Sequence, residues 1–234
     1  MTEAVFFDWF TTLADYVPAR CDLYCQAFDE LGIKIPVDAA IRGVLLGDEC
    51  VYSENLRFPL SKRTREERMD VYLAFPRMIA GEARLEASDE VLRTVRDRIR
   101  GLFQPTTFVL FDDVLPTMKI LKERGLILGV ITNLRDDMTP VCDVLGLSPY
   151  LSFTVTSGQV GAGKPNPAIF QAALEKAGVS AGVTTYVGDQ YKLDIVGARG
   201  VGIEPILIDR CDLYEHITDC PRIRTLAEVP AYIS

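Results

Sequence analysis

Histidine, paired cysteines and long apolar runs are scarce or missing in this sequence, and each shortage narrows the possible functions. The one histidine, His216, excludes any site that needs two imidazole side chains. The six cysteines include no Cys-x-x-Cys pair, which favours reduced structural thiols over a disulfide framework or a zinc centre. No apolar stretch is long enough to cross a bilayer, and no basic region precedes the first apolar run as in a signal peptide. We therefore expect a cytoplasmic protein that is not inserted in a membrane.

Basic residues are also fewer than acidic residues in this sequence. The 25 Lys and Arg residues are outnumbered by 33 Asp and Glu residues, which gives a formal net charge of −8, and the basic residues form no run. This balance weighs against nucleic acid or an anionic membrane as the main partner. It leaves room for an anionic small-molecule substrate, because a single pocket can be locally positive.

The order of predicted elements suggests a core with a smaller domain inserted in it. Residues 3–9 form an apolar run that predicts a buried strand. From about residue 18 to residue 103 the pattern changes to amphipathic helices without a clear strand, predicted at 21–31, 37–46, 64–79 and 88–102. We expect residues 17–104 to form a helical cap domain, joined to the core by two crossings near Tyr16 and Pro105.

The rest of the chain alternates strands and helices. Strands are predicted at 126–132, 153–156, 184–187 and 206–209, and helices at 114–124, 136–145, 167–177 and 193–199. This alternation is typical of a parallel sheet that helices cover on both faces. The predicted fold is therefore α/β, a doubly wound, Rossmann-like parallel sheet formed by residues 1–16 and 105–234, with the all-α cap inserted.

Polar residues lie at four expected carboxyl ends of the core strands. They are Asp8 with Thr12, then Thr132 with Asn133, then Lys164, and last Asp189 after Gly188, with Asp194 five residues further. In a parallel sheet these ends meet at one edge, so we expect the side chains to converge on one crevice. Together they offer a nucleophilic carboxylate, hydroxyl and amide donors, a cation and acidic metal ligands.

This set of motifs resembles the haloacid dehalogenase-like (HAD) hydrolase superfamily, in its subfamily I with a helical C1-type cap. The matching residues are Asp8 with Thr12-Leu13, Thr132-Asn133, Lys164-Pro165 with Pro167 and Phe170, and Gly188-Asp189 with Asp194, Gly197 and Ala198. Each motif alone is weak, but all four occur in order and on the expected elements. The resemblance covers essentially the whole chain.

The resemblance implies a role for each group. Asp8 would be the nucleophile that forms a covalent aspartyl intermediate. Mg²⁺ would be held by Asp8, the backbone carbonyl of Phe10 and Asp189, with Asp194 nearby or bound through water. Lys164 would pair with Asp8 and with the transferring group. Hydroxyl and amide groups of Thr12, Thr132 and Asn133 would bind phosphoryl oxygens.

Two residues depart from the pattern of the phosphatases in this superfamily. Thr11 replaces their usual glycine, although a threonine suits a backbone with positive φ poorly. Phe10 replaces the aspartate that protonates the leaving oxygen, a contribution of roughly 10²–10⁴-fold in rate. An aromatic residue at that position is typical of haloacid dehalogenases, whereas an aspartate at position 189 is typical of Mg²⁺-dependent members.

These residues lead to three hypotheses about function. The favoured one is a Mg²⁺-dependent, phosphatase-like hydrolase that acts on a phosphorylated metabolite with altered acid catalysis, because clustered carboxylates repel one another when no cation is bound. The alternatives are a metal-independent 2-haloacid dehalogenase and a non-catalytic binding protein with the same fold. The sequence leaves the oligomeric state open between a monomer and a homodimer.

Overall fold

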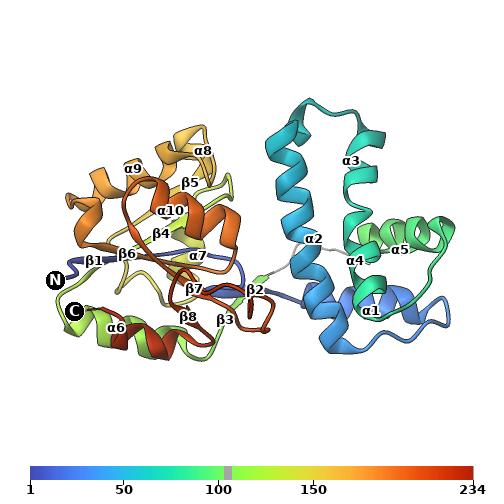
Figure 1. Cartoon of the computed structure of the whole chain (residues 1–234), viewed down its shortest axis with the longest axis horizontal. Helices are drawn as coiled ribbons and strands as arrows, with labels where there is room; N and C mark the ends of the chain where they lie inside the picture. The colour runs from blue at the N-terminus through green and yellow to red at the C-terminus, as the bar shows by residue number, and fades with distance from the viewer. Residues whose placement is uncertain (103–106, 234) are drawn as a thin grey trace. The chain divides into compact units, whose positions relative to one another are not determined.

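The computed structural model describes residues 1–102 and 107–233, which divide into two compact units (Figure 1). One unit comprises Met1–Asp15 and Phe108–Ser234, and the other comprises Tyr16–Thr107. The predicted crossing near Pro105 lies outside the described residues. A two-stranded sheet of β2 (Ala14–Val17) and β3 (Thr107–Leu110), which the sequence did not predict, lies where the chain passes between the units. None of the described helices has the length and apolar character needed to cross a membrane.

The first unit is built on a six-stranded sheet in the order β5-β4-β1-β6-β7-β8, and all of its neighbouring strands are parallel. The strands are β1 (Ala4–Phe7), β4 (Ile127–Thr132), β5 (Phe153–Thr156), β6 (Thr184–Gly188), β7 (Glu204–Ile208) and β8 (Arg222–Ile223). β1 and its two neighbours are buried along most of their length. The apolar runs of the sequence therefore became central strands, as parallel sheets require.

Helices cover both faces of this sheet, which confirms the predicted doubly wound fold. Alternate residues of β1 point to opposite faces, so that Val5 and Phe7 belong to one apolar core and Ala4 and Phe6 to the other. The first core is covered by α6 (Val114–Glu123), α7 (Thr139–Val144) and the 3₁₀ helix η4 (Leu226–Ala231). The second is covered by α9 (Pro167–Ala177) and α10 (Val196–Gly200), while the short α8 (Ser157–Val160) follows β5 (Figure 1).

Apart from the strand residues at its ends, the described part of the second unit forms helices. They are α1 (Arg20–Asp29), α2 (Val37–Arg57), α3 (Arg65–Val71), α4 (Ala74–Glu82) and α5 (Asp89–Leu102), with a short 3₁₀ turn η1 (Leu60–Lys62). Helix α2 packs closely on α4, and a Cβ atom added at Gly43 would lie 2.4 Å from the backbone of Ile79. A glycine at this position therefore permits the close approach of the two helices.

Two helix predictions in this unit were wrong in extent. The helix predicted at 37–46 runs on to Arg57, and it ends where Phe58 precedes Pro59, because a residue before proline disfavours helical dihedrals. The helix predicted at 64–79 is split into α3 and α4. Pro76 lies in the first turn of α4, where its missing N–H is tolerated, whereas a continuous helix would place its ring against the carbonyl of Tyr72.

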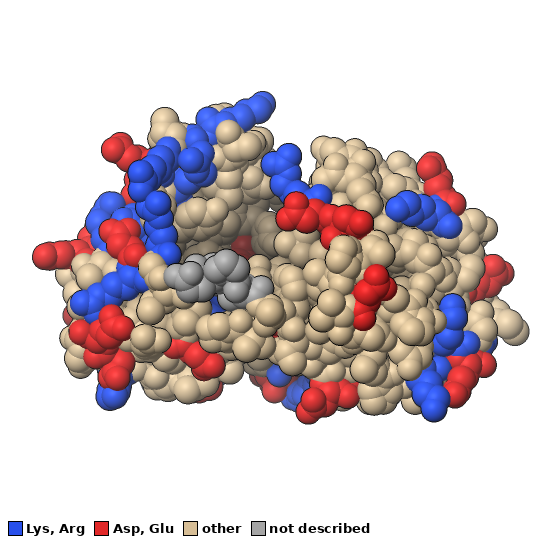
Figure 2. Space-filling model, turned by 180° about the vertical axis from the view of Figure 1, so that it is seen from behind, with Lys and Arg blue, Asp and Glu red and all other residues tan. Residues whose placement is uncertain are grey.

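Basic side chains gather on the helical unit in Figure 2, with acidic side chains among them. Several join neighbouring helices by ion pairs, such as Arg20 with Asp48, Arg42 with Glu82, and Arg98 with Glu30. The last two pairs, whose side chains are 30–45% exposed, contribute only about 0–1 kcal/mol each. The apolar core of the unit, which includes Phe28, Ile79 and Val95, therefore supplies most of its stability.

Candidate active site

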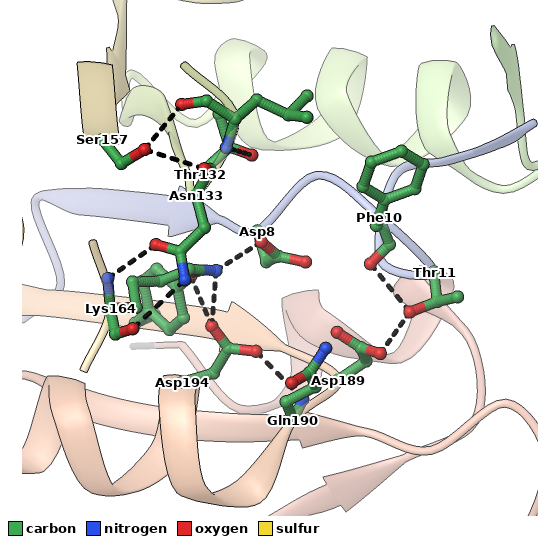
Figure 3. Close-up of polar contacts among 12 residues, drawn as sticks. Asp8, Phe10, Thr11, Thr132, Asn133, Ser157, Lys164, Asp189, Gln190 and Asp194 are labelled. Atoms are coloured by element: carbon green, nitrogen blue, oxygen red, sulfur yellow. Dashed lines mark hydrogen bonds and ion pairs between the residues drawn. The ribbon is translucent and has the colours of Figure 1, made fainter. Parts of the chain in front are cut away.

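The structure brings the polar residues of all four motifs to one edge of the sheet (Figure 3). Asp8 directly follows β1, and its amide continues the ladder by donating to the carbonyl of Val187 at 2.9 Å. Thr132 is the last residue of β4, and Asp189 directly follows β6. Because β1 lies between β4 and β6, residues from distant parts of the chain become neighbours.

Lys164 lies at the centre of a buried polar network. Its ammonium group donates to Asp8 Oδ1, to Asp194 Oδ1 at 2.7 Å and to the hydroxyl of Tyr186 at 3.0 Å. The Tyr186 hydroxyl in turn donates to Asp194 Oδ1 at 2.9 Å. Burial lowers the pKa of Lys164, but Asp194 and Asp8 outweigh it and raise the pKa above its ordinary value. Three acceptors use all three ammonium protons, so Lys164 is charged and fixed in place.

The side chain of Asn133 fixes the backbone of Lys164. Asn133 Oδ1 accepts from the Lys164 amide at 2.6 Å, and Asn133 Nδ2 donates to the Lys164 carbonyl at 3.1 Å. The loop that carries Asn133 is held by Ser157, whose hydroxyl lies 2.8 and 3.0 Å from the carbonyls of Asn133 and Leu134 and donates its one proton to either of them. The second motif thus positions the lysine of the third, which the sequence did not reveal.

Three carboxylates form an acidic cluster beside this lysine. Asp8, Asp189 and Asp194 each offer an oxygen, and these atoms lie within 4.8 Å of one another. Asp194 Oδ1 already accepts from Lys164, and Asp194 Oδ2 accepts from the amide of Gln190 at 2.9 Å. An added Cβ atom at Gly188 would lie 2.4 Å from the Asp194 carboxyl carbon, so glycine makes room for this carboxylate.

The cluster carries more negative charge than Lys164 offsets. Burial raises the pKa of Asp8 to about 6, although Lys164 acts in the opposite direction. Burial and the nearby carboxylates Asp8 and Asp194 raise the pKa of Asp189 well above its ordinary range. Asp189 Oδ1 is buried and has no hydrogen-bond partner among the described residues. An unpartnered buried oxygen among close carboxylates fits a hard divalent cation, which prefers oxygen ligands.

The turn after β1 contains both departures from the phosphatase pattern. The ring of Phe10 packs on Phe108, with ring centroids 5.5 Å apart, and Figure 3 shows it pointing away from Asp8. Thr11 has a φ of +54°, so the turn requires the left-handed backbone that glycine adopts without strain. The Thr11 hydroxyl bonds to the Phe10 carbonyl at 2.8 Å and to Asp189 Oδ2.

Two hydroxyl groups of the predicted phosphate site are buried at the same edge. Thr12 Oγ1 is fully buried and has no hydrogen-bond partner among the described residues. Thr132 Oγ1 accepts from the amide of Leu134 at 3.2 Å, which leaves its own proton to donate to a ligand. Both hydroxyl groups can therefore donate a hydrogen bond to an anion.

Sequence reasoning missed two residues that shape the site. Tyr186 lies in the middle of the buried strand β6, and nothing in the sequence distinguishes it from a tyrosine of the apolar core. Arg210 follows β7 and donates to the carbonyls of Thr11 and Thr12 at 3.1 and 2.9 Å. Nothing in the sequence connects Arg210 with a turn almost 200 residues away.

The profile of haloacid dehalogenase-like hydrolases matches residues 2–202. The chain belongs to this family. This hydrolase is 35% identical over 130 residues to haloacid dehalogenase-like hydrolase domain-containing protein 3 of Danio rerio, a match that covers 54% of each chain. It thus spans about half the length of the curated relatives it matches.

Two solved structures resemble this hydrolase over nearly its whole length. One is a HAD phosphatase from Thermococcus onnurineus, with 25% identity and a TM-score of 0.57 over 99% of this chain and 97% of that one. The other is a 2-haloacid dehalogenase from Pseudomonas syringae pv. Tomato DC3000, with 27% identity and a TM-score of 0.57 over the same shares. The two enzyme hypotheses left open by the sequence, a phosphatase and a dehalogenase, are thus represented at nearly equal similarity.

Proposed function

We propose that this hydrolase is a Mg²⁺-dependent, phosphatase-like enzyme that acts on small phosphorylated molecules. The acidic cluster is the observation that carries the proposal, above all the buried and unpartnered oxygen of Asp189. A dehalogenase that works without metal has no use for Asp189, which adds a further negative charge beside Asp8 and Asp194.

Asp8 is proposed to attack the phosphorus atom. A new bond from Asp8 to phosphorus replaces the bond to the leaving oxygen, and water then hydrolyses the aspartyl phosphate. Lys164 holds the attacking carboxylate and offsets the negative charge of both reactants. Thr12 and Thr132 are proposed to donate their hydroxyl protons to the phosphoryl oxygens.

The residues present fit the divalent cation that this reaction needs. The cation would be held by Asp8, Asp189 and the carbonyl of Phe10. Asp194 would lie near it, fixed by its hydrogen bonds from Lys164 and from the amide of Gln190. When bound, Mg²⁺ would offset negative charge on the transferring phosphoryl group. The replacement of aspartate by Phe10 does not remove this ligand, because the ligand is a backbone carbonyl that every residue has.

Phe10 restricts the substrates of such an enzyme. Its ring cannot donate a proton, and it packs on Phe108 instead of turning toward the leaving group. We therefore propose substrates whose leaving group departs without a proton, such as acyl phosphates and aryl phosphates. Alkyl phosphates would lack the general acid that contributes roughly 10²–10⁴-fold.

A 2-haloacid dehalogenase is the second candidate. The aromatic residue at position 10 and the similarity to the Pseudomonas enzyme favour it, because a halide leaves without a proton. A cytoplasmic location and the choice between a monomer and a homodimer stay predictions.

An activity panel with matched variants separates these functions. Phosphate esters, acyl phosphates and 2-haloacids are assayed with Mg²⁺ and with chelator, using the wild type, Asp8→Asn and the control Asp136→Asn, which alters an exposed carboxylate. We expect Mg²⁺-dependent phosphate release that Asp8→Asn abolishes and the control retains. Halide release in chelator would instead establish the dehalogenase, and no turnover of any substrate would point to a binding protein.

A further inference from the structure

Thr11 connects two of the atoms proposed to hold the cation. Its hydroxyl lies within hydrogen-bonding distance of both the Phe10 carbonyl, at 2.8 Å, and Asp189 Oδ2. Figure 3 shows this chain of contacts from the turn after β1 to the end of β6. The contact with Asp189 spans 178 positions of the sequence, so it joins the first and fourth motifs.

The backbone of Thr11 indicates that its side chain is needed at this position. A φ of +54° is unusual for any residue with a Cβ atom and is an outlier for a β-branched one. Glycine would adopt the same turn without strain but would provide no hydroxyl. A strained residue that persists beside a site is a reason to look for a functional role.

Arg210 also holds this turn. Its guanidinium donates to the carbonyls of Thr11 and Thr12, pairs with both oxygens of Asp113, and lies 4.1 Å from the ring centroid of Phe111. With its backbone held in this way, Thr11 directs its hydroxyl toward Asp189.

The Asp189 carboxylate needs a positive charge beside it. A hydroxyl has one proton, so it donates to either the Phe10 carbonyl or Asp189 Oδ2 at any moment. Asp189 Oδ1 has no hydrogen-bond donor among the described residues. The Asp189 carboxylate therefore has more lone pairs than the described donors satisfy, and a cation beside it would make up the difference.

We propose that Thr11 is a positioning residue for the divalent cation, because its hydroxyl holds the Phe10 carbonyl and the Asp189 carboxylate in the arrangement that the cation binds. This inference rests on the proposed Mg²⁺ site. It assigns to position 11 a role that a glycine there cannot have.

The test measures Mg²⁺ binding rather than turnover. Isothermal titration calorimetry of the full chain gives the Mg²⁺ dissociation constant, and the Mg²⁺-dependent rise in Tm checks it. The variants are Thr11→Ser, which keeps the hydroxyl, Thr11→Val, which keeps the shape, and Thr11→Gly, which removes both the hydroxyl and the strain. The control is Thr139→Val, which removes an exposed threonine hydroxyl that donates to Asp137.

We expect Thr11→Val and Thr11→Gly to bind Mg²⁺ about 10–100-fold more weakly, as is typical when a partner of a metal ligand is lost. Thr11→Ser and Thr139→Val should bind like the wild type. If Thr11→Val does not fold, Thr11→Gly decides, since its turn is free of strain.

Three results would overturn the inference. They are wild-type affinity in Thr11→Gly, tighter binding in Thr11→Gly, and a loss in Thr11→Ser as large as in Thr11→Gly. In each case the wild type binds Mg²⁺ and the proposed function stands. A wild type that binds no Mg²⁺ would remove both the inference and the cation on which the proposed function depends.

Discussion

Replacing Lys164 with methionine would leave two buried carboxylates without their cation. The lysine side chain is 3% exposed, and its partners Asp8 and Asp194 are 9% and 1% exposed, so water cannot take its place. Removing one partner from a buried ion pair costs about 3–5 kcal/mol. A chain of this size loses about 2–4 °C in Tm per kcal/mol, so Lys164→Met should lower Tm by roughly 6–20 °C.

The single tryptophan makes this change measurable in the α/β unit alone. Trp9 is adjacent to Asp8 and fully buried, so its fluorescence reports the unfolding of the unit that contains the site. The matched control is Lys119→Met, which alters an exposed lysine on α6 of the same unit and should leave Tm nearly unchanged.

The pH dependence gives a second check. The pKa of Asp8 is about 6 in the folded protein against 3.8 as its ordinary value, and loss of Lys164 raises it further. The folded variant therefore holds a proton that the unfolded chain releases, and this favours folding at low pH and is lost as the pH rises through the folded pKa. We expect a smaller deficit in Tm at pH 5 than at pH 8. A deficit no larger than that of Lys119→Met, or one independent of pH, would refute this account of the network.

Three further predictions concern the turn and the cluster. Phe10→Asp should raise kcat/KM for alkyl phosphates by about 10²-fold or more relative to aryl phosphates, since it restores a general acid; an unchanged ratio between the two substrates would contradict this role. The Mg²⁺ dissociation constant should fall from pH 5 to pH 7, because protons compete with the cation for Asp8 and Asp189, whose pKa values are raised; calorimetry at several pH values that gave a flat profile would argue against the site. Arg210→Met should lower Tm by about 3–12 °C, given about 1.5–3 kcal/mol for hydrogen bonds to charged groups, and an unchanged tryptophan transition would show that the turn does not need this guanidinium.

The sequence determined the fold class because buried strands and helices have recognisable patterns of apolar residues. A continuous apolar run at β1 and at β4 predicts central strands, and the alternation with helices predicts a covered parallel sheet. The structure and the family profile confirm both. Local turn chemistry was equally readable at Asn166, which caps α9 with Pro167 at its first turn.

Helix boundaries in the second unit were less accessible. The predicted end of the second helix was 11 residues short of Arg57, because none of residues 48–57 is buried and the apolar periodicity that marks a helix therefore fades there. The division between α3 and α4 follows from Pro76, because a proline inside a continuous helix would clash with the turn before it.

The sequence by itself determined which residue types gather at the edge of the sheet, since parallel strands direct their carboxyl ends the same way. Only the tertiary structure decided which of them touch. The hydroxyl of Thr11 meets Asp189, Asn133 holds the backbone of Lys164, and Arg210 holds the turn, because β1 lies between β4 and β6 and brings distant loops together. Strand order and side-chain direction determine such contacts, and neither can be predicted from the sequence of a single segment.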